Sequence, residues 1–552
     1  MVALSAAIAL SAPAARSAEA EYPTEPYVAA SSARAFGDSV GVTVRFTWNS
    51  TAYGNFDAVE SRLRELGVRY VTDGFCPTCK YQIDRMNRLA ALGIKANIGV
   101  SGLNAGVPAM EAALNVIREK LLGSVVSLTA PNEPDISGDP QWAAHSRTYQ
   151  QELYTRVKSD PALRHLVVLG PPLVYRESRA ALGDISAYLD RGNIHPYPAG
   201  IMPMTFLDAE KQMALLVSGT KPLVATETGY HNDLDYLGAH RGASEQAAAM
   251  YTPRSVLEAY RQGVERTYIY QLIDAFSPQQ EIERNTPGGQ NAFGLLNWDF
   301  SRKPAFIALR NLLRVVDGDS APVASAGGLR VGVEGAGPDV RQLLLRSADG
   351  SYSLVLWRQV SVWDRAALKD LDPGSDSVEV VLGERIATAQ RFDPVASDAE
   401  TARWSDPRRI PLSLAGSPVV LRLTPPGLES LQQKKKTSAD DRKRSLAPSR
   451  QRLRKRLTVK IACAKPCASV VARGRLVVKR AKRTRTFRLR AARERARGGV
   501  VVLHLKVPAR AWRVARKTLE QGGQVRARLT VTKRSARGAK LRSAKRTIAL
   551  RR

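Results

Sequence analysis

Short apolar runs alternate with longer amphipathic stretches over residues 40–316. A run of four to eight apolar residues is typical of a buried strand, whereas apolar positions three and four apart are typical of a helix that packs against a sheet. The sequence therefore predicts repeated β-α units and a parallel sheet. We expect its strands at residues 41–46, 68–72, 94–100, 125–130, 166–170, 193–197, 223–226 and 267–272.

The stretch between the first two expected strands has helical spacing. Its apolar residues are Phe56, Val59, Leu63 and Leu66, and Gly67 then ends the helix. A last helix is expected at residues 303–313, where Pro304 suits the first turn. Eight β-α units in about 280 residues match a (β/α)₈ TIM barrel, an α/β fold that we expect over residues 36–316. An open doubly wound sheet is the alternative, but no glycine-rich phosphate-binding motif follows the first strand.

Beyond residue 317 apolar and polar positions alternate. Runs at 340–345 and 352–357 flank Ser347-Ala348-Asp349-Gly350 and predict a hairpin. With further runs at 378–382 and 419–423, they predict a β-sandwich over residues 317–426. Residues 427–450 have the low hydrophobicity and high charge of a linker. A small basic all-β domain is expected at 451–552, with strands at 457–461, 475–478, 486–490, 500–507, 525–531 and 547–550.

The charge of the chain is divided unevenly between its parts. The whole chain carries +32, yet residues 427–552 hold 41 Lys and Arg against five Asp and Glu, a net charge of +36. Residues 1–426 therefore carry −4. Such an appendage on a near-neutral body is expected to bind a polyanion, such as an anionic polymer of the cell envelope. A basic surface that is merely solvated is the alternative.

Nucleic acid is a less favoured partner for this basic part. Lysine and arginine neutralise phosphates in any sequence, but proteins that bind single strands also stack bases on aromatic rings. The predicted C-terminal domain has only Phe487 and Trp512 for that purpose. Phosphate binding alone therefore remains as the nucleic-acid hypothesis.

The first 20 residues predict export. An apolar run, Val2 to Ala14, precedes Ser17-Ala18-Glu19-Ala20, which resembles a signal-peptidase site. The run is too short to span a bilayer, so no transmembrane span is expected. No Lys or Arg precedes it, which leaves a disordered Ala-rich leader as the alternative. We expect an extracellular or cell-envelope-associated protein.

The four cysteines form two close pairs, Cys76 with Cys79 and Cys463 with Cys467. A zinc site needs four ligands together, whereas these pairs fall in different predicted domains. In an exported protein the pairs predict two local disulfides, with free thiols as the alternative. No metal site and no cofactor is expected.

Two glutamates follow expected strands in positions suited to catalysis. Glu133 comes just after the run at 125–130, and Glu227 follows the run at 223–226. Their separation of 94 residues corresponds to three β-α repeats of about 31 residues each, so both fall at strand ends of one barrel. Hydrolysis of a glycosidic bond needs two carboxyl groups that converge. The pair therefore predicts a glycoside hydrolase that acts on a carbohydrate substrate.

Asn-Glu-Pro at residues 132–134, together with Thr-Glu-Thr-Gly at residues 226–229, resembles clan A of the retaining glycoside hydrolases. That clan includes family-five cellulases and family-thirty-nine xylosidases. The resemblance covers residues 36–316, and the predicted sandwich is similar to an accessory domain that many members carry.

The resemblance implies roles for the two glutamates. Glu133 would be the general acid/base and Glu227 the nucleophile of a double displacement, with their carboxyl groups about 5–5.5 Å apart. Asn132 would bind the sugar 2-hydroxyl. Because the acid must be protonated while the nucleophile is ionised, their surroundings are expected to push the two pKa values apart.

Further candidates lie near these glutamates in the sequence. His195 and Tyr197 end the sixth run and are two residues apart, so both side chains can face one pocket, as such a pair does in the clan. Tyr230 and His231 follow the nucleophile and are expected either to line a sugar subsite or to cap the loop.

The remaining candidates end other expected strands. Tyr270 ends the eighth run, where the clan usually has a tryptophan, so the sugar preference stays open. Arg45 and Asp73 end the first and second runs and are expected to reach the pocket. The alternative for the whole chain is a catalytically inactive protein that binds carbohydrate or the cell envelope.

Overall fold

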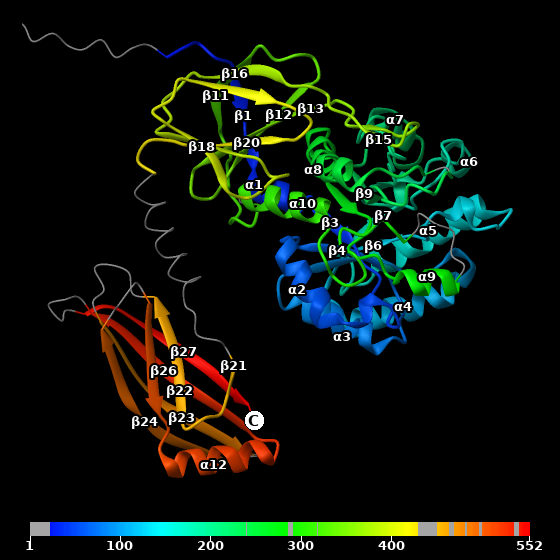
Figure 1. Cartoon of the computed structure of the whole chain (residues 1–552). Helices are drawn as coiled ribbons and strands as arrows, with labels where there is room; N and C mark the ends of the chain where they lie inside the picture. The colour runs from blue at the N-terminus through cyan, green and yellow to red at the C-terminus, as the bar shows by residue number, and fades with distance from the viewer. Residues whose placement is uncertain are drawn as a thin grey trace, which may run out of the picture. The chain divides into compact units, whose positions relative to one another are not determined.

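The computed structural model describes residues 22–238, 240–284, 291–316, 318–428, 450–462, 469–480, 483–495, 500–534 and 540–551. The chain divides at residue 428 into two compact units (Figure 1). The predicted leader, residues 1–20, and most of the predicted linker, residues 427–450, lie outside the described residues.

An eight-stranded parallel sheet forms the centre of the first unit. Its order is β7-β6-β5-β4-β3-β10-β9-β8, so consecutive strands are neighbours. Every predicted run overlaps one of its strands. They are β3 (Val40–Thr43), β4 (Tyr70–Gly74), β5 (Lys95–Gly99), β6 (Val125–Thr129), β7 (Val167–Leu169), β8 (Gly192–Ile194), β9 (Leu223–Thr228) and β10 (Arg266–Ile269).

The two ends of this sheet meet between β7 and β8. Leu169 forms a parallel bridge with Arg191, and the Gly170 N–H donates to the Arg191 carbonyl over 3.0 Å. These contacts close the sheet into a barrel. The predicted TIM barrel is confirmed.

Helices alternate with the barrel strands along the chain. The longer ones are α2 (Phe56–Leu66), α3 (Lys80–Ala90), α4 (Gly106–Lys120), α5 (Trp142–Ser159), α7 (Leu207–Ser218), α8 (Glu245–Arg261) and α10 (Pro304–Val315). Shorter ones are α1 (Ala33–Asp38), α6 (Ser178–Leu182) and α9 (Pro278–Arg284), with 3₁₀ turns η1 (Ala52–Gly54), η2 (Leu103–Ala105), η3 (Pro134–Ile136) and η4 (Ser186–Tyr188).

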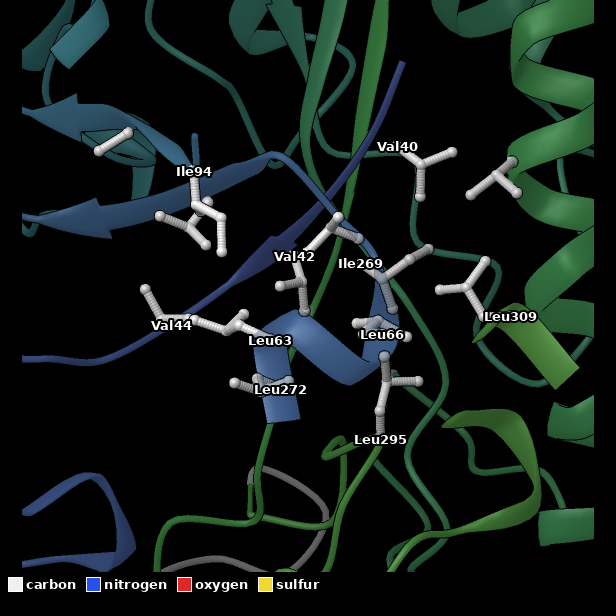
Figure 2. Close-up of a cluster of buried hydrophobic side chains, with 14 of the residues drawn as sticks. Val40, Val42, Val44, Leu63, Leu66, Ile94, Ile269, Leu272, Leu295 and Leu309 are labelled. Carbon is white, nitrogen blue, oxygen red and sulfur yellow. The ribbon is translucent and has the colours of Figure 1, made fainter. Parts of the chain in front are cut away.

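Helix α2 illustrates how the sequence sets these elements. The Asn55 side chain accepts the Ala58 N–H at its start, and Gly67 ends it with φ 87°. Its apolar stripe packs onto the barrel, where Leu63 and Leu66 lie beside Val42 of β3 (Figure 2). The bounds of α2 agree with the predicted helix.

Two antiparallel sheets form the β-sandwich of the first unit. Their orders are β1-β11-β16-β19 and β18-β17-β20-β13-β12-β2, with β14 and β15 as a separate pair. The strands are β1 (Tyr27–Ala29), β2 (Ser31–Ser32), β11 (Gly328–Glu334), β12 (Val340–Arg346), β13 (Tyr352–Arg358), β14 (Trp363–Asp364), β15 (Lys369–Asp370), β16 (Asp376–Leu382), β17 (Thr388–Phe392), β18 (Glu400–Ser405), β19 (Arg409–Leu414) and β20 (Val419–Thr424).

The sandwich takes strands from both sides of the barrel in the sequence. The predicted hairpin is β12–β13, with Val340 opposite Arg358. Strand β1 pairs with β11 and β2 pairs with β12, so residues that precede the barrel also belong to the sandwich. The sequence analysis did not assign these two strands.

Contacts from α8 join the sandwich to the barrel. Arg254 is fully buried and donates to the carbonyl oxygens of Val360 over 2.8 Å and Gly416 over 3.3 Å. Trp363 Nε1 donates to the Gly242 carbonyl over 3.1 Å. The segment around β14 is therefore tied to a loop that follows barrel strand β9.

The second unit is a separate β domain with its own hydrophobic core. Its sheets have the orders β21-β27-β26-β23-β24 and β22-β25. The elements are β21 (Arg450–Arg452), β22 (Arg456–Ala462), β23 (Ser469–Arg480), β24 (Arg483–Arg495), β25 (Val500–Lys506), α12 (Ala509–Glu520), β26 (Gln524–Arg534) and β27 (Lys540–Arg551). The predicted strands match, and the β domain also contains one helix, α12, that was not predicted.

One predicted disulfide is confirmed. Cys76 and Cys79 are bonded in the loop between β4 and α3. Cys463 and Cys467 lie outside the described residues. No helix in the described part of the chain has the length and apolar character needed to cross a membrane.

Candidate active site

The C-terminal ends of β6 and β9 bring the two predicted glutamates together. Glu133 follows β6 and begins the 3₁₀ turn η3, whereas Glu227 lies within β9 near its end. Glu133 has φ 45° and ψ 56°, a left-handed conformation that costs a non-glycine residue about 1–2 kcal/mol. Strain of this kind is common at functional sites, where the surrounding structure holds it in place.

The glutamates form a close trio with His195. One atom from each of the two carboxylates and from the imidazole lie within 4.8 Å of one another. The side chains of Glu133 and Glu227 are 22% and 13% exposed, so both are largely buried but remain accessible to a ligand. Carboxylates and imidazole are also metal ligands, so this trio is the place in the described chain where a cation could bind.

His195 binds Glu133 directly. His195 Nδ1 lies 2.7 Å from Glu133 Oε1 and 3.9 Å from Glu227 Oε2. Burial raises the pKa of the Glu133 carboxyl, but the hydrogen bond and charge of His195 oppose burial, and the pKa lies below its usual value. A glutamate that acts as a general acid by itself is expected to have a raised pKa instead. Glu133 and His195 must therefore be treated together as one proton-binding pair.

A chain of hydrogen bonds behind His195 fixes where its protons reside. The Thr226 N–H and hydroxyl both donate to Asn193 Oδ1, over 3.3 and 2.9 Å. The Thr226 oxygen must therefore accept from His195 Nε2, which lies 2.9 Å away. With a proton fixed on Nε2, neutral His195 has a lone pair on Nδ1, so it shares one mobile proton with Glu133.

Glu227 is bound by two other side chains. The Tyr197 hydroxyl donates to Glu227 Oε2 over 2.8 Å, and Arg45 Nη2 lies 3.8 Å from Glu227 Oε1. Burial and the Glu227 charge raise the pKa of Tyr197 well above its usual value, so its hydroxyl stays protonated. Arg45 also donates to the Tyr270 hydroxyl over 3.2 Å. The predicted residues Arg45, Tyr197 and Tyr270 thus surround Glu227.

An aromatic pair beside Arg45 was not predicted. The Trp48 ring stacks on Phe276 with centroids 5.6 Å apart, and the Arg45 guanidinium lies 5.6 Å from the Trp48 centroid. Trp48 is 36% exposed, so part of its ring is available to a ligand. Its position soon after the first strand was a signal that sequence reasoning could have used.

A cavity of 410 Å³ opens on the Glu133 side of the trio. It is lined by Glu133, His195 and Tyr197, but not by Glu227 or Arg45. Apolar side chains form much of its wall: Ile136, Val174, Met202, Met204, Phe206 and Leu207. A group bound between the two carboxylates would therefore have space to extend past Glu133.

Four predicted residues form no hydrogen bond or ion pair with Glu133 or Glu227 in the described part of the chain. Tyr230 is buried, donates to the Ile201 carbonyl and stacks on Tyr251. His231 is buried behind Phe293, and Nε2 binds the His240 carbonyl. These contacts are those of residues that hold the loop.

The other two differ in burial. Asp73 is buried and accepts hydrogen bonds from the Phe46 N–H and from Gln82, so it supports the strand ends rather than lining the pocket. Asn132 is exposed next to Glu133 and forms no hydrogen bond with a described residue. Its expected contact with a sugar stays a prediction.

Comparisons with known proteins find only distant likenesses. No protein-family model and no curated protein matches the chain. It is similar to a β-xylosidase from Caulobacter crescentus CB15 with 15% identity and a TM-score of 0.49, over 72% of this chain and 98% of that one.

Two further solved structures are similar at the same level. A glycoside hydrolase family 17 β-1,3-glucanosyltransferase from Rhizomucor miehei gives 18% identity, coverage of 48% and 95%, and a TM-score of 0.39. A glucosidase from Croceicoccus marinus has 11% sequence identity over 66% of this chain and 91% of that one, with a TM-score of 0.44. Likenesses this distant do not establish a substrate, so the function must be argued from the site.

Proposed function

We propose that the chain is a retaining glycoside hydrolase in which Glu133 is the general acid/base and Glu227 the nucleophile. The observation that carries this proposal is the approach of their carboxylate oxygens to within 4.8 Å. Retaining enzymes hold these groups about 5–5.5 Å apart, whereas inverting enzymes need about 6.5–9.5 Å to admit a water molecule. The short separation favours a covalent glycosyl-enzyme.

The neighbours of each glutamate suit these roles. Tyr197 and Arg45 hold a donor and a positive charge against Glu227, which orients one carboxylate oxygen for attack on the anomeric carbon. Glu133 gives the leaving oxygen its proton and later accepts one from water. The cavity on the Glu133 side gives the leaving group a place to bind.

The substrate is an O-glycosidic bond of an oligosaccharide or polysaccharide. The expected leader and the Cys76–Cys79 disulfide support an extracellular or envelope-associated enzyme. Membership of clan A is part of the proposal, supported by the positions of Glu133 just after the fourth barrel strand and of Glu227 near the end of the seventh.

Replacement of Glu227 by Ala is the decisive experiment. We expect it to abolish hydrolysis of an aryl glycoside that wild type cleaves, identified by a screen of glucosides, xylosides, mannosides, galactosides and arabinosides. The product of wild type should keep the anomeric configuration of the substrate, as followed by NMR. Glu119→Ala is the matched control, because it makes the same change at an exposed glutamate of α4 outside the candidate site.

Four outcomes would contradict the proposal. Unchanged turnover in Glu227→Ala would reject the nucleophile, and an inverted product would reject the double displacement. Binding of carbohydrate without turnover in wild type would favour the inactive protein. Loss of wild-type activity in a chelator, restored by a divalent cation, would assign the trio to a metal instead.

A further inference from the structure

The outer face of the second unit carries a row of arginines. Arg475 of β23 stands directly opposite Arg488 of β24 on one side and Arg528 of β26 on the other. All three are exposed, whereas their strand neighbours Leu476, Leu489 and Leu529 are buried. Because side chains alternate across a strand, the three guanidinium groups share the face opposite the core.

This arrangement is unfavourable for the isolated domain. Cross-strand neighbours have Cβ atoms about 4.5–5.5 Å apart, and like charges directly opposite each other destabilise a sheet. None of the three arginines forms an ion pair with a described residue, and β23, β24 and β26 contain one acidic residue, Glu494. A negatively charged partner would remove the repulsion.

The chemistry of the face selects the kind of partner. Exposed Arg473 and Arg526 extend the row along the strands, and the exposed hydroxyl of Thr530 lies opposite Arg473. A guanidinium group binds a carboxylate or phosphate through two parallel hydrogen bonds. Hydroxyl side chains between such groups can in turn bind sugar hydroxyls.

Two features disfavour nucleic acid. The one aromatic residue of β23, β24 and β26 is Phe487, which packs against the core, so no ring of these strands is available to stack a base. A five-stranded sheet is about 19 Å wide at the usual strand spacing, whereas the major groove of DNA is about 12 Å wide. The face is too broad to enter that groove.

We infer that this arginine face, defined by Arg473, Arg475, Arg488, Arg526 and Arg528, binds a linear acidic polysaccharide through its carboxylate groups. This face provides a defined binding site for the anionic partner expected from the charge of the chain. Binding of the polymer at this face does not require glycosidase activity. Binding of the polymer and turnover of a small glycoside can therefore fail separately.

The test compares two triple variants of the full chain that lose the same charge. Arg475, Arg488 and Arg528 are changed to Gln in the first. Arg510, Arg513 and Lys517, exposed on α12, are changed to Gln in the second. The probe is polygalacturonate at about 0.15 M salt, where weak long-range attraction is largely screened. We expect the first variant to lose at least about tenfold in affinity and the control about twofold.

A third variant tests the guanidinium geometry and guards against misfolding. Arg475, Arg488 and Arg528 are changed to Lys, which keeps the charge and the face. We expect affinity to fall at least about threefold, because lysine cannot form the two parallel bonds. The melting temperature of the Gln triple should be unchanged or higher, since the repulsion is relieved. If the Gln triple variant of these three arginines unfolds, the affinity of the Lys triple variant tests the inference.

Three results would overturn the inference. Equal losses in the two Gln triples would mean that net charge, not this face, binds the polymer. Full affinity in the Lys triple would exclude paired bonds to carboxylates. Tighter binding of duplex DNA than of polygalacturonate at equal charge concentration, lost in the first variant, would replace the polysaccharide with nucleic acid.

Discussion

The hydroxyl of Thr226 determines which nitrogen of neutral His195 carries the proton. Thr226→Val removes the acceptor of His195 Nε2. The imidazole can then carry its proton on Nδ1 and donate to the Glu133 carboxylate, which no longer has a proton to give. We expect kcat/KM for a glycoside with a poor leaving group to fall about tenfold or more, because protonation of the leaving oxygen contributes 10²–10⁴-fold.

A dinitrophenyl glycoside separates this effect from simple distortion. Its leaving group needs no acid, so Thr226→Val should change its turnover about threefold at most. Thr226→Ser should keep both activities. Thr228→Val is the matched control, since Thr228 is equally buried on the same strand but donates to the Pro196 carbonyl. Equal losses on both substrates would mean that Thr226 only maintains structure.

Asp73 couples the stability of the barrel to pH. Burial raises its pKa to about 7, despite hydrogen bonds from Gln82 and Phe46 and the charge of Arg45. The folded state therefore holds a proton that the unfolded chain releases near pH 4. The free energy of unfolding contributed by Asp73 falls as pH rises from about 4 to 7 and is then constant.

Asp73→Asn should remove most of this pH dependence. An amide oxygen at the position of Oδ2 still accepts from Phe46 and Gln82, so the hydrogen bonds survive. In urea unfolding at pH 4.5 and 7.5 we expect the variant to lose less stability between the two pH values than wild type. Burial also raises the pKa of Asp274, to about 6. In Asp73→Asn, Asp274 should therefore leave a smaller decrease of the free energy of unfolding with rising pH. An unchanged slope would contradict this account.

Strand order predicted which residues meet at the site better than it predicted the direction of each side chain. Glu133, Glu227, His195 and Tyr197 lie within a barrel strand or at most four residues beyond one, and the C-terminal ends of these strands meet at one edge of the barrel. Tyr230 lies two residues beyond β9 but turns into the core, a direction that strand order does not set.

The loop that carries Trp48 illustrates the same limit. Its approach to Phe276 depends on a contact between residues more than two hundred positions apart. No local pattern encodes such a contact. The hydrogen bonds that link Asn193, Thr226 and His195 were not predicted for the same reason, because they join polar side chains of two adjacent strands.

Elements were predicted where they have a full apolar pattern. Helix α2 has both caps and a four-residue stripe, and its bounds were correct. Strands β1 and β2 have three and two residues, too few for any period to appear. Helix α12 is an exception, because its apolar stripe was present in the sequence but was not used: Ala511, Ala515 and Thr518 are buried, and Trp512, Val514 and Leu519 pack beside the same core.

Helix α8 should couple the barrel and the sandwich through Arg254. Arg254→Ala would leave the carbonyl groups of Val360 and Gly416 buried without a donor. Each such group costs about 1–3 kcal/mol, so we expect a loss of about 2–5 kcal/mol in the free energy of unfolding. Denaturant titration of the full chain, followed by tryptophan fluorescence, would measure it.

Gln246 on the same helix provides the comparison. Its side chain is exposed and forms no hydrogen bond with a described residue, so Gln246→Ala should cost less than about 1 kcal/mol. Similar losses in the two variants would mean that α8 is sensitive to any change. In that case the contacts of Arg254 with the sandwich would not be the cause.

The candidate active site and the excess of positive charge lie in different units. Every side chain of the candidate active site lies in residues 45–276, within the first unit. The second unit has its own core and nearly all of the positive charge. A net charge confined to one unit is therefore expected to govern which polyanions the chain binds.

Removal of residues 429–552 should therefore separate attachment from catalysis. We expect the shortened chain to hydrolyse a small aryl glycoside with kcat/KM within about twofold of the full chain, since Glu133, Glu227 and the side chains that bind them all belong to the first unit. Its retention on immobilised polygalacturonate should disappear, because the remaining chain is slightly negative. A large loss of turnover on the small glycoside would show that the second unit completes the active site. Retention that persists would place the polymer site on the barrel or the sandwich, where no comparable excess of positive charge exists.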